Sequence, residues 1–156
     1  MNNIDSFKDE YRFLSNFYPA PVQFDGIRFP TVEHAYQFAR TLDQEWRQQI
    51  RQAPTPGKAK RLARKAPPRE DWKEIKVGVM RELLKQKFAA DELKRQLLET
   101  AGRELVEGNY WHDNFWGVCS CGICCGGQNT LGRLLMEIRR ELMGETIIPQ
   151  SLTSVE

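Results

Sequence analysis

The stretch YRFLSNFYPAPVQFDGIRFPTVEHAYQ, residues 11–37, determines the fold at the start of this chain. Asp25 and Gly26 lie between two short apolar runs, and an Asp-Gly pair is typical of a tight hairpin turn, which needs positive φ angles. Pro30 ends the second run. Thr31 is a good N-cap, and the apolar residues after it recur with the period of a helix. The stretch therefore predicts a β-hairpin followed directly by a helix.

The rest of the chain has mainly helical patterns. Apolar periodicity, caps and helix breakers predict helices at 44–52, 55–65 and 70–87, a further helix capped by Asp91, a short strand at 104–107, and a last helix capped by Asn129-Thr130. We find no internal repeat and no linker. The fold class expected is α+β, mainly helical, in a single compact domain with an N-terminal β-hairpin. That domain is expected to span residues 1–143, with 144–156 as a loosely ordered C-terminal tail.

Length and composition are typical of a single compact domain. The chain has 156 residues, enough to bury a core, and a formal net charge of +2. No apolar run is long enough to cross a bilayer, and the N-terminus lacks a signal-peptide pattern. We therefore expect a cytoplasmic protein with no membrane partner. The net charge is too small to indicate a nucleic-acid partner by itself.

Glu33 and His34 fall in the first turn of the helix that follows the hairpin. The helix dipole favours a carboxylate there, so one interpretation is a capping carboxylate beside a surface histidine. The other interpretation is functional, because a rigid hairpin and the helix donors would hold the carboxylate of Glu33 still.

A basic run without any acidic residue precedes the longest helix. It consists of Lys58, Lys60, Arg61, Arg64, Lys65 and Arg69. A solvated helix face is one interpretation, because charge runs commonly keep surfaces wet. A phosphate-binding site is the other, because Arg and Lys side chains grip phosphate oxygens and the helix N-terminus near Thr55 adds backbone donors.

Two tryptophans, Trp111 and Trp116, lie in the polar loop NYWHDNFWG at 109–117, where helix or strand packing does not require them. An exposed indole ring can stack on a nucleobase. Alternatively, both rings pin the loop to the core. Asp113 in the same loop is a second candidate carboxylate.

The cysteines are crowded into the run CSCGICC. They are Cys119, Cys121, Cys124 and Cys125. Such crowding in a cytosolic protein favours metal over a disulfide, and the C-x-x-C spacing from Cys121 to Cys124, with His112 nearby, is typical of a zinc knuckle. A structural zinc at Cys119, Cys121 and Cys124 is one interpretation. Reduced thiols in a loop are the alternative, because no second, separated pair of ligands follows.

Six elements of the sequence, in order, resemble one known family. They are LSNFYP (14–19) with GIRFPTVEHAYQ (26–37), Ala59-Lys60 with Arg64, Trp72 with Val79-Met80 and Lys87-Phe88, Leu105-Val106-Glu107, DNFWG (113–117), and GQNTLGRLLMEIR (127–139). In this order they are similar to the signature of the NADAR family of N-glycosidases. The resemblance runs from about residue 7 to residue 142, and six ordered elements are far more specific than one.

The resemblance implies an enzyme that hydrolyses an N-glycosidic bond. The substrate would be a phosphorylated ribosyl-base or ADP-ribosyl-base: a riboflavin-pathway aminopyrimidine ribosyl phosphate or ADP-ribosylated guanine, the latter free or within nucleic acid. Such hydrolysis asks for two carboxyl groups, which we assign to Glu33 and Asp113 as catalytic residues. The residues expected to bind substrate are Asn16, Tyr36, Arg40, Lys60, Arg64, Trp72, Trp111 and Trp116. No cofactor is required for this chemistry.

A lysine is a rival participant, because Lys60, Lys76 or Lys87 could attack C1′ of the opened sugar and form a Schiff base. Many members of the family carry a lysine seven residues after the glutamate, where this chain has Arg40. A guanidinium stays protonated and cannot act as an amine nucleophile. We therefore assign Arg40 to phosphate or carboxylate binding.

Two other classes of function stay open. A non-catalytic module that binds ADP-ribose or another NAD derivative would keep Trp72, Trp116 and the basic run, but it would not need Glu33. A small metal-stabilised nucleic-acid-binding protein would need zinc and a steep salt dependence of binding. The sequence leaves the physiological substrate and the oligomeric state undetermined.

Overall fold

The structure is a computed structural model that describes residues 2–124 and 126–144. Its elements are the 3-10 helix η1 (Asp9–Leu14), strands β1 (Val22–Phe24) and β2 (Ile27–Phe29), helices α1 (Val32–Arg40), α2 (Gln44–Arg51), α3 (Pro56–Ala63), α4 (Trp72–Lys87) and α5 (Asp91–Glu99), strands β3 (Gly108–Asn109) and β4 (Val118–Cys119), and helix α6 (Thr130–Leu142). The predicted tail, apart from Gly144, lies outside the described residues.

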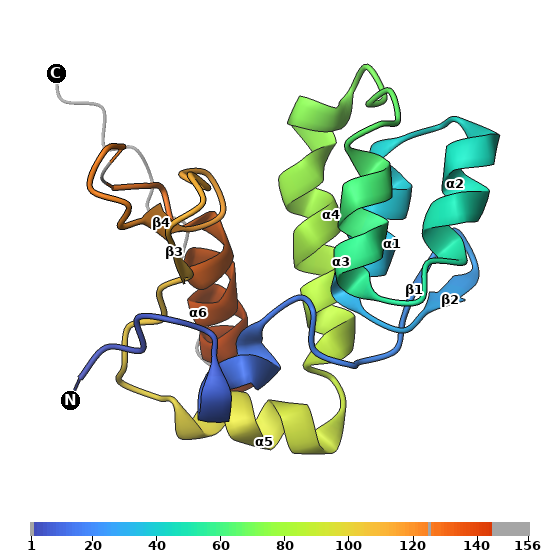
Figure 1. Ribbon diagram of the computed structural model, residues 1–156. Helices are drawn as coiled ribbons and strands as arrows, with labels where there is room; N and C mark the ends of the chain where they lie inside the picture. Colours follow the sequence, from blue (N-terminus) through green and yellow to red (C-terminus); the bar gives the residue numbers. More distant parts are fainter. Residues whose placement is uncertain (1, 125, 145–156) are drawn as a thin grey trace, which may run out of the picture.

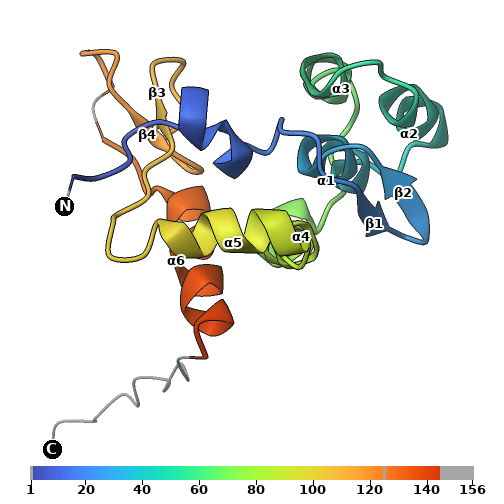
Figure 2. The same ribbon diagram turned by 90° about the horizontal axis from the view of Figure 1, so that it is seen from below.

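The elements form two groups that α5 links along one edge (Figure 1). One group holds α1 to α4 with the hairpin β1–β2, and the other holds α6 with β3 and β4. Helix α4 contacts α6, and the view from below shows α5 running between them (Figure 2). The mainly helical α+β fold with an N-terminal hairpin is thus confirmed. No helix in the described part of the chain is long and apolar enough to span a membrane.

The hairpin forms for the reason that its turn residues predict. Asp25 and Gly26 have φ angles of 49° and 73°, which a two-residue turn of this kind requires. The strands are antiparallel, with Val22 opposite Phe29. Phe29 is buried, so the turn fixes the register that places this ring in the core.

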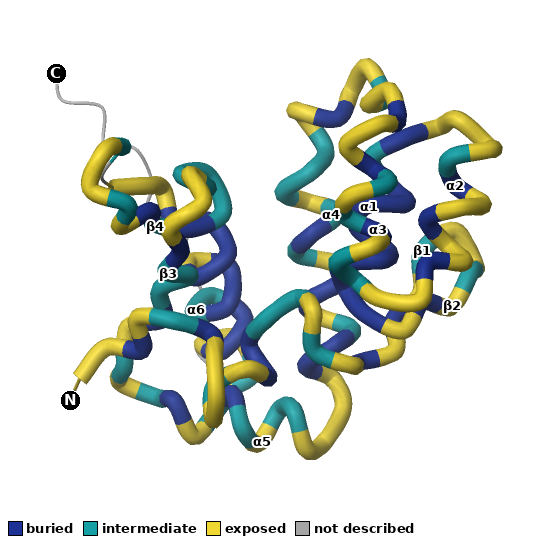
Figure 3. Tube along the Cα trace, viewed as in Figure 1, coloured by how far each residue is buried: buried dark blue, intermediate teal, exposed yellow. Residues whose placement is uncertain are grey.

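Helix α1 is the centre of its group. The Thr31 side chain accepts a hydrogen bond of 3.1 Å from the backbone N of His34, which confirms the predicted N-cap. Residues Val32–Ala39 are all buried, as α2, α3, α4 and the hairpin pack around the helix (Figure 3). The interpretation of His34 as a surface histidine is wrong: its Nδ1 lies 2.8 Å from Thr31 Oγ1 and its Nε2 lies 3.0 Å from the carbonyl oxygen of Ala53.

The short strand predicted at 104–107 is not formed. Leu105 makes an isolated parallel bridge with Ile4, and the regular strand is β3, which begins at Gly108. The side chain of Asn129 takes the place of a neighbouring strand. Its Nδ2 donates to the carbonyl oxygen of Leu105 at 2.9 Å, and its Oδ1 accepts from the backbone N of Glu107 at 3.0 Å.

Two helix starts also differ from expectation in their caps. Asp91, predicted as a cap, is the first residue of its helix, so the N-cap is Ala90 and no side chain caps it. Asn129 is the N-cap of α6, yet its side chain makes no capping bond because it is used by the segment at 104–107. Its φ of 50° is left-handed, a conformation that asparagine tolerates better than most residues.

Strands β3 and β4 form a parallel pair that holds the loop at 110–117 between them. Parallel strands usually need a longer connection, so this loop is tightly tied. Gly117 permits the close approach, since a Cβ there would lie 2.2 Å from the carbonyl oxygen of Glu107. The loop carries most of the candidate residues from the second half of the chain.

We predict that Asn129→Ala destabilises the fold by about 1–3 kcal/mol, because it leaves two buried backbone groups unpaired and removes a residue suited to positive φ. Urea unfolding followed by far-UV circular dichroism measures this change. The exposed Asn3 is the matched control, and Asn3→Ala should stay within about 0.5 kcal/mol of the parent protein. Equal effects of the two substitutions would contradict the bridging role of Asn129.

Candidate functional site

One cavity of about 410 Å³ opens between the two groups of elements. Its walls come from the segment after η1, from α1, α3, α4 and α6, and from the loop at 110–117. It gathers every site residue predicted from the sequence except Arg64: Asn16, Glu33, Tyr36, Arg40, Lys60, Trp72, Trp111, Asp113 and Trp116. Segments far apart in the sequence therefore meet at one place.

Glu33 lies on the wall of this cavity and is only 6% exposed. Its backbone N donates to the carbonyl oxygen of Asn16 at 3.1 Å, and its Oε1 accepts a hydrogen bond of 2.8 Å from Gln37 Nε2. Burial raises the pKa of Glu33, an effect that the Gln37 hydrogen bond and the Lys60 charge oppose. An ordinary capping carboxylate points to solvent, so this enclosure is evidence against the capping interpretation.

Glu107 is a third carboxyl group in the cavity, and it is not among the site residues predicted from the sequence. Its Oε2 is enclosed and has no hydrogen-bond partner among the described residues. Burial is the main cause that raises its pKa to about 7, with the nearby charge of Asp113 next, while Lys60 opposes the shift. The residue is part of the family-like element Leu105-Val106-Glu107, but nothing local in the sequence indicates that its Oε2 is enclosed.

Asp113 lines the same cavity, but part of its carboxylate has a structural task. Oδ1 accepts hydrogen bonds from the backbone N of Phe115 at 3.2 Å and of Trp116 at 2.9 Å. The side chain of Asn109 binds the backbone of Asp113 twice: Asn109 Nδ2 donates to the carbonyl oxygen of Asp113, and Asn109 Oδ1 accepts from its backbone N. Asp113 thus shapes the loop as well as presenting charge to the cavity.

Aromatic rings form one side of the cavity. Tyr36 lies 5.0 Å from Trp72 and 5.6 Å from Trp116, centroid to centroid, and its hydroxyl accepts a 3.2 Å bond from Trp116 Nε1. Trp116 therefore pins the loop to the core and also lines the cavity. Trp111 is 47% exposed and packs edge-on against Tyr110, which leaves it accessible to a ligand.

The predicted cations divide into three kinds. Lys60 is half-buried and lines the cavity, whereas Arg64 is exposed and does not line it, although its charge is near enough to favour the ionised form of Glu33. Arg40 also lines the cavity, but its Nη1 donates to the carbonyl oxygens of Ala63 at 2.6 Å and Ala66 at 3.3 Å. Its guanidinium is therefore partly committed to the end of α3.

The three rival lysines have different surroundings. Lys76 Nζ lies 3.7 Å from the centroid of the Phe115 ring, and it does not line the cavity. Lys87 is fully buried and donates to the carbonyl oxygen of Ser15 at 2.7 Å; burial lowers its pKa to about 7, while Glu107 favours its charged form. Lys60 is the one of the three that lines the cavity.

Asn16 contributes an enclosed acceptor to the cavity wall. Its Nδ2 contacts the sulfur of Met80 at 3.6 Å, and its Oδ1 has no hydrogen-bond partner in the described part of the chain. Together with Oε2 of Glu107 it offers two enclosed oxygen atoms. Such atoms are suited to a ligand that carries hydroxyl or amino donors.

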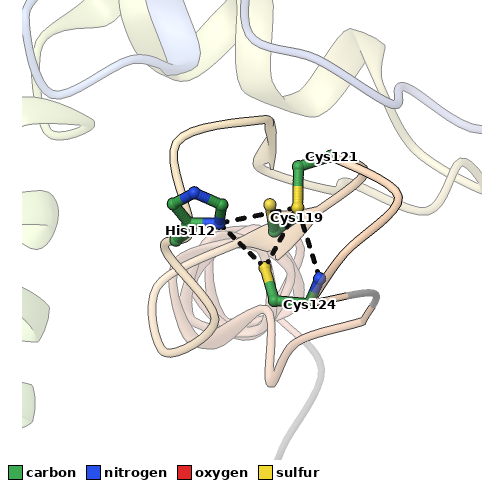
Figure 4. A group of neighbouring side chains, drawn as sticks. All are labelled: His112, Cys119, Cys121 and Cys124. Atoms are coloured by element: carbon green, nitrogen blue, oxygen red, sulfur yellow. Dashed lines mark hydrogen bonds between the residues drawn. The ribbon is translucent and has the colours of Figure 1, made fainter.

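The predicted metal ligands meet outside the cavity. His112, Cys119, Cys121 and Cys124 place their ligand atoms within 4.8 Å of one another, so they could hold a metal ion (Figure 4). Cys125 lies outside the described residues. His112 falls between two cavity residues in sequence, Trp111 and Asp113, and this links the cluster to the loop of the candidate site.

The family profile of the NADAR domain matches residues 4–143. The chain belongs to the NADAR family. It is 40% identical to "N-glycosidase YbiA" of Escherichia coli over 143 residues, which cover 90% of this chain and 87% of that protein. It is 37% identical to a "Riboflavin biosynthesis protein" of Vibrio vulnificus, covering 86% of this chain but 36% of the longer relative.

A solved structure agrees with the NADAR assignment. The NMR structure of the Escherichia coli protein YbiA matches with a TM-score of 0.77 at 38% identity, covering 93% of this chain and 85% of that one. The sequence elements that suggested the NADAR family surround the cavity, because each of the six contributes at least one lining residue; the GQNTLGRLLMEIR element contributes Leu131 alone. The family signature and the cavity wall therefore coincide.

The raised pKa of Glu107 leads to a prediction about stability. Between its ordinary pKa of 4.5 and about 7, the folded protein keeps a proton that the unfolded chain has lost, so the free energy of unfolding falls as pH rises. Glu107→Gln removes this ionisation. Relative to the parent, the variant should gain stability across this window, by up to roughly 3 kcal/mol.

Urea unfolding at a series of pH values measures the difference between parent and variant. The exposed Glu104, three residues earlier, is the control for the Glu-to-Gln change itself, and Glu104→Gln is measured over the same pH series. A difference between Glu107→Gln and the parent that stays flat across these pH values would contradict the raised pKa of Glu107.

Proposed function

We propose that this protein is an N-glycosidase that hydrolyses the bond between ribose C1′ and a base nitrogen in a phosphorylated ribosyl-base or ADP-ribosyl-base. The enzyme class rests on its relatives: a NADAR protein of nearly the same length, with 40% identity, is named an N-glycosidase, a hydrolase of N-glycosyl bonds. The single structural observation that supports the proposal is the enclosed Glu33, held by a helix start and Gln37 on the wall of the cavity.

The chemistry suits a site with several carboxyl groups. Cleavage of the bond develops oxocarbenium character on the sugar, so one carboxylate stabilises that charge or takes a proton from the attacking water. A second group, protonated beforehand, gives its proton to the departing nitrogen. The water oxygen bonds to C1′, and the products are the free base and the free sugar.

We assign the carboxylate to Glu33 on its contacts: burial raises its pKa, but Gln37 Nε2 donates to its Oε1 at 2.8 Å and the nearby Lys60 charge also favours the ionised form. Glu107 suits the acid, because burial raises its pKa to about 7 and it therefore holds a proton near neutral pH. Asp113, whose Oδ1 is bound by two backbone N–H groups, keeps the loop in place and adds negative charge beside the sugar. This division assigns the acid to a residue outside the original pair of Glu33 and Asp113.

The remaining walls suit the other parts of such a substrate. Lys60 can pair with a phosphate, and the half-buried Trp116 and exposed Trp111 can contact a base. The enclosed acceptor Oδ1 of Asn16 suits a ribose hydroxyl or an amino group of the base. The reaction as proposed uses no cofactor.

Between the two substrate classes we place the aminopyrimidine ribosyl phosphate of riboflavin synthesis first. The name of the Vibrio vulnificus relative supports this choice. ADP-ribosylated guanine, free or within nucleic acid, is the second candidate. Incubation with each substrate, followed by mass detection of free base and free sugar, separates the two.

We predict that Glu33→Gln lowers kcat by roughly 10²–10⁴-fold while ligand still binds, because glutamine keeps the shape but not the charge. Steady-state turnover and isothermal titration with substrate measure the two effects. Glu45, an exposed carboxylate in the first turn of α2, is the matched control. Glu45→Gln should leave turnover unchanged.

Near-normal turnover by Glu33→Gln, on a substrate that the parent cleaves, would end the catalytic role of this residue. Binding without cleavage by the parent protein would instead favour a non-catalytic module for ADP-ribose or a related ligand. The two results are therefore distinguishable.

Lys60 gives a second prediction, because a phosphate clamp and a Schiff-base nucleophile respond differently to substitution. If Lys60 binds phosphate, Lys60→Arg keeps the charge and most of the activity. Lys60→Met should raise KM for the phosphorylated substrate roughly 10–100-fold, the cost of one charge-assisted hydrogen bond, and hardly change KM for the dephosphorylated analogue.

The exposed Lys65 of the same basic run is the control, and Lys65→Met should leave both KM values unchanged. Loss of kcat in both Lys60 variants, together with a borohydride-trapped sugar on Lys60 of the parent, would establish the nucleophile instead of the clamp. Equal KM effects for both substrates would mean that Lys60 belongs to a solvated face.

A further inference from the structure

Four metal-binding side chains that the proposed reaction does not use converge beside the catalytic loop (Figure 4). His112 Nδ1 lies 3.1 Å from Cys124 Sγ and 3.5 Å from Cys121 Sγ, and the two sulfur atoms are 3.3 Å apart. Cys119 completes the group, with all four ligand atoms within 4.8 Å of one another. The three cysteines carry free thiols.

These distances are close to those of a tetrahedral site. Zn–S bonds of about 2.3 Å and Zn–N bonds of about 2.0–2.1 Å place neighbouring ligand atoms roughly 3.5–3.8 Å apart. The three measured separations, 3.1–3.5 Å, lie at or just below that range, and all four ligand atoms lie within 4.8 Å of one another, so small side-chain shifts would centre an ion. Three thiolates and one imidazole are a ligand set that structural zinc sites use.

The backbone around Cys121 is already arranged for a metal-bound thiolate. The backbone N atoms of Ile123 and Cys124 both donate to Cys121 Sγ at 3.3 Å, which stabilises negative charge on sulfur. Gly122, with a φ of 84°, permits the tight turn between the two cysteines. These backbone contacts are a separate observation from the closeness of the four side chains, and they too favour a bound metal ion.

Backbone hydrogen bonds also join the two ends of the segment that carries the three cysteines. Cys119 N donates to the carbonyl oxygen of Gly126 at 2.8 Å, and Gly126 N donates back at 3.2 Å. The first cysteine ligand is thus fixed at the base of the turn that carries the other two. Cys119 is itself buried, which suits a ligand that water does not reach.

We infer that His112, Cys119, Cys121 and Cys124 form a structural zinc site that fixes one wall of the cavity. Four protein ligands fill a tetrahedral ion and leave no position for a reacting water, so the metal stabilises rather than reacts. His112 is flanked by Trp111 and Asp113, two cavity residues. The ion therefore ties the loop at 110–117 to the segment at 119–124.

The first test uses the parent protein, purified without chelator from zinc-containing medium. Elemental analysis and native mass spectrometry should find one zinc ion per chain. Replacement by Co²⁺ should give the visible absorption of a tetrahedral thiolate site, and removal of the metal by a chelator should lower the Tm, because metal binding is coupled to folding.

The second test uses variants. Cys121→Ser and Cys124→Ser should each lose zinc and lower the Tm. Ile123 lies between them in sequence and is 88% exposed, so Ile123→Ser is the matched control and should keep both zinc and Tm. Where a cysteine variant fails to fold, the cobalt spectrum of the parent still decides the question.

Metal-free parent protein of unchanged Tm would overturn the inference, and so would a disulfide between Cys121 and Cys124 in the freshly purified protein. Equal zinc binding by the Ile123 and cysteine variants would do the same. One expectation rests on the proposed function: loss of zinc should loosen the cavity wall and thereby lower turnover. The zinc content and the Tm do not depend on that function. Bound zinc in a protein that cleaves neither substrate would refute the function alone.

Discussion

The rest of the structure depends on the burial of helix α1, which carries polar as well as apolar side chains. Residues Val32–Ala39 of α1 are all enclosed, although Glu33, His34 and Gln37 carry polar side chains. A buried polar group is costly unless it is hydrogen-bonded, so each needs a partner inside the protein. His34 finds Thr31 and a carbonyl oxygen of the α2–α3 connection, and Gln37 finds Glu33. Of these bonds, the one from His34 to Ala53 ties the α2–α3 connection to α1, while the hairpin, α2, α3 and α4 pack around the helix.

Local signals in the sequence were sufficient where the structure is local. The Asp25-Gly26 turn and the caps at Thr31 and Thr55 each act within a few residues, so the hairpin and the helices after them were predicted correctly. The strand expected at 104–107 failed for the opposite reason. Its hydrogen bonds go to Ile4 and to the Asn129 side chain, about a hundred residues and about twenty-five residues away, and no local pattern reports such partners.

The candidate site shows the same division. Family-like elements identified residues that the fold does bring to one cavity, from Asn16 to Trp116. They did not reveal that Oε2 of Glu107 is enclosed, nor that Arg64 is exposed and outside the cavity lining, because burial depends on how the two groups of elements meet. The charges were readable from the sequence, whereas their pKa values follow from enclosure.

Arg40 shows how a departure from the family pattern is absorbed. Its Nη1 caps carbonyl oxygens at the C-terminal end of α3, the helix that carries Lys60. A cation is favoured at that end of a helix, so the guanidinium stabilises α3 against α1. Lysine has a single ammonium group on a flexible stem and would hold these carbonyl oxygens less firmly. An arginine at this position therefore ties the end of α3 to α1, and α3 is the helix that presents Lys60 to the cavity.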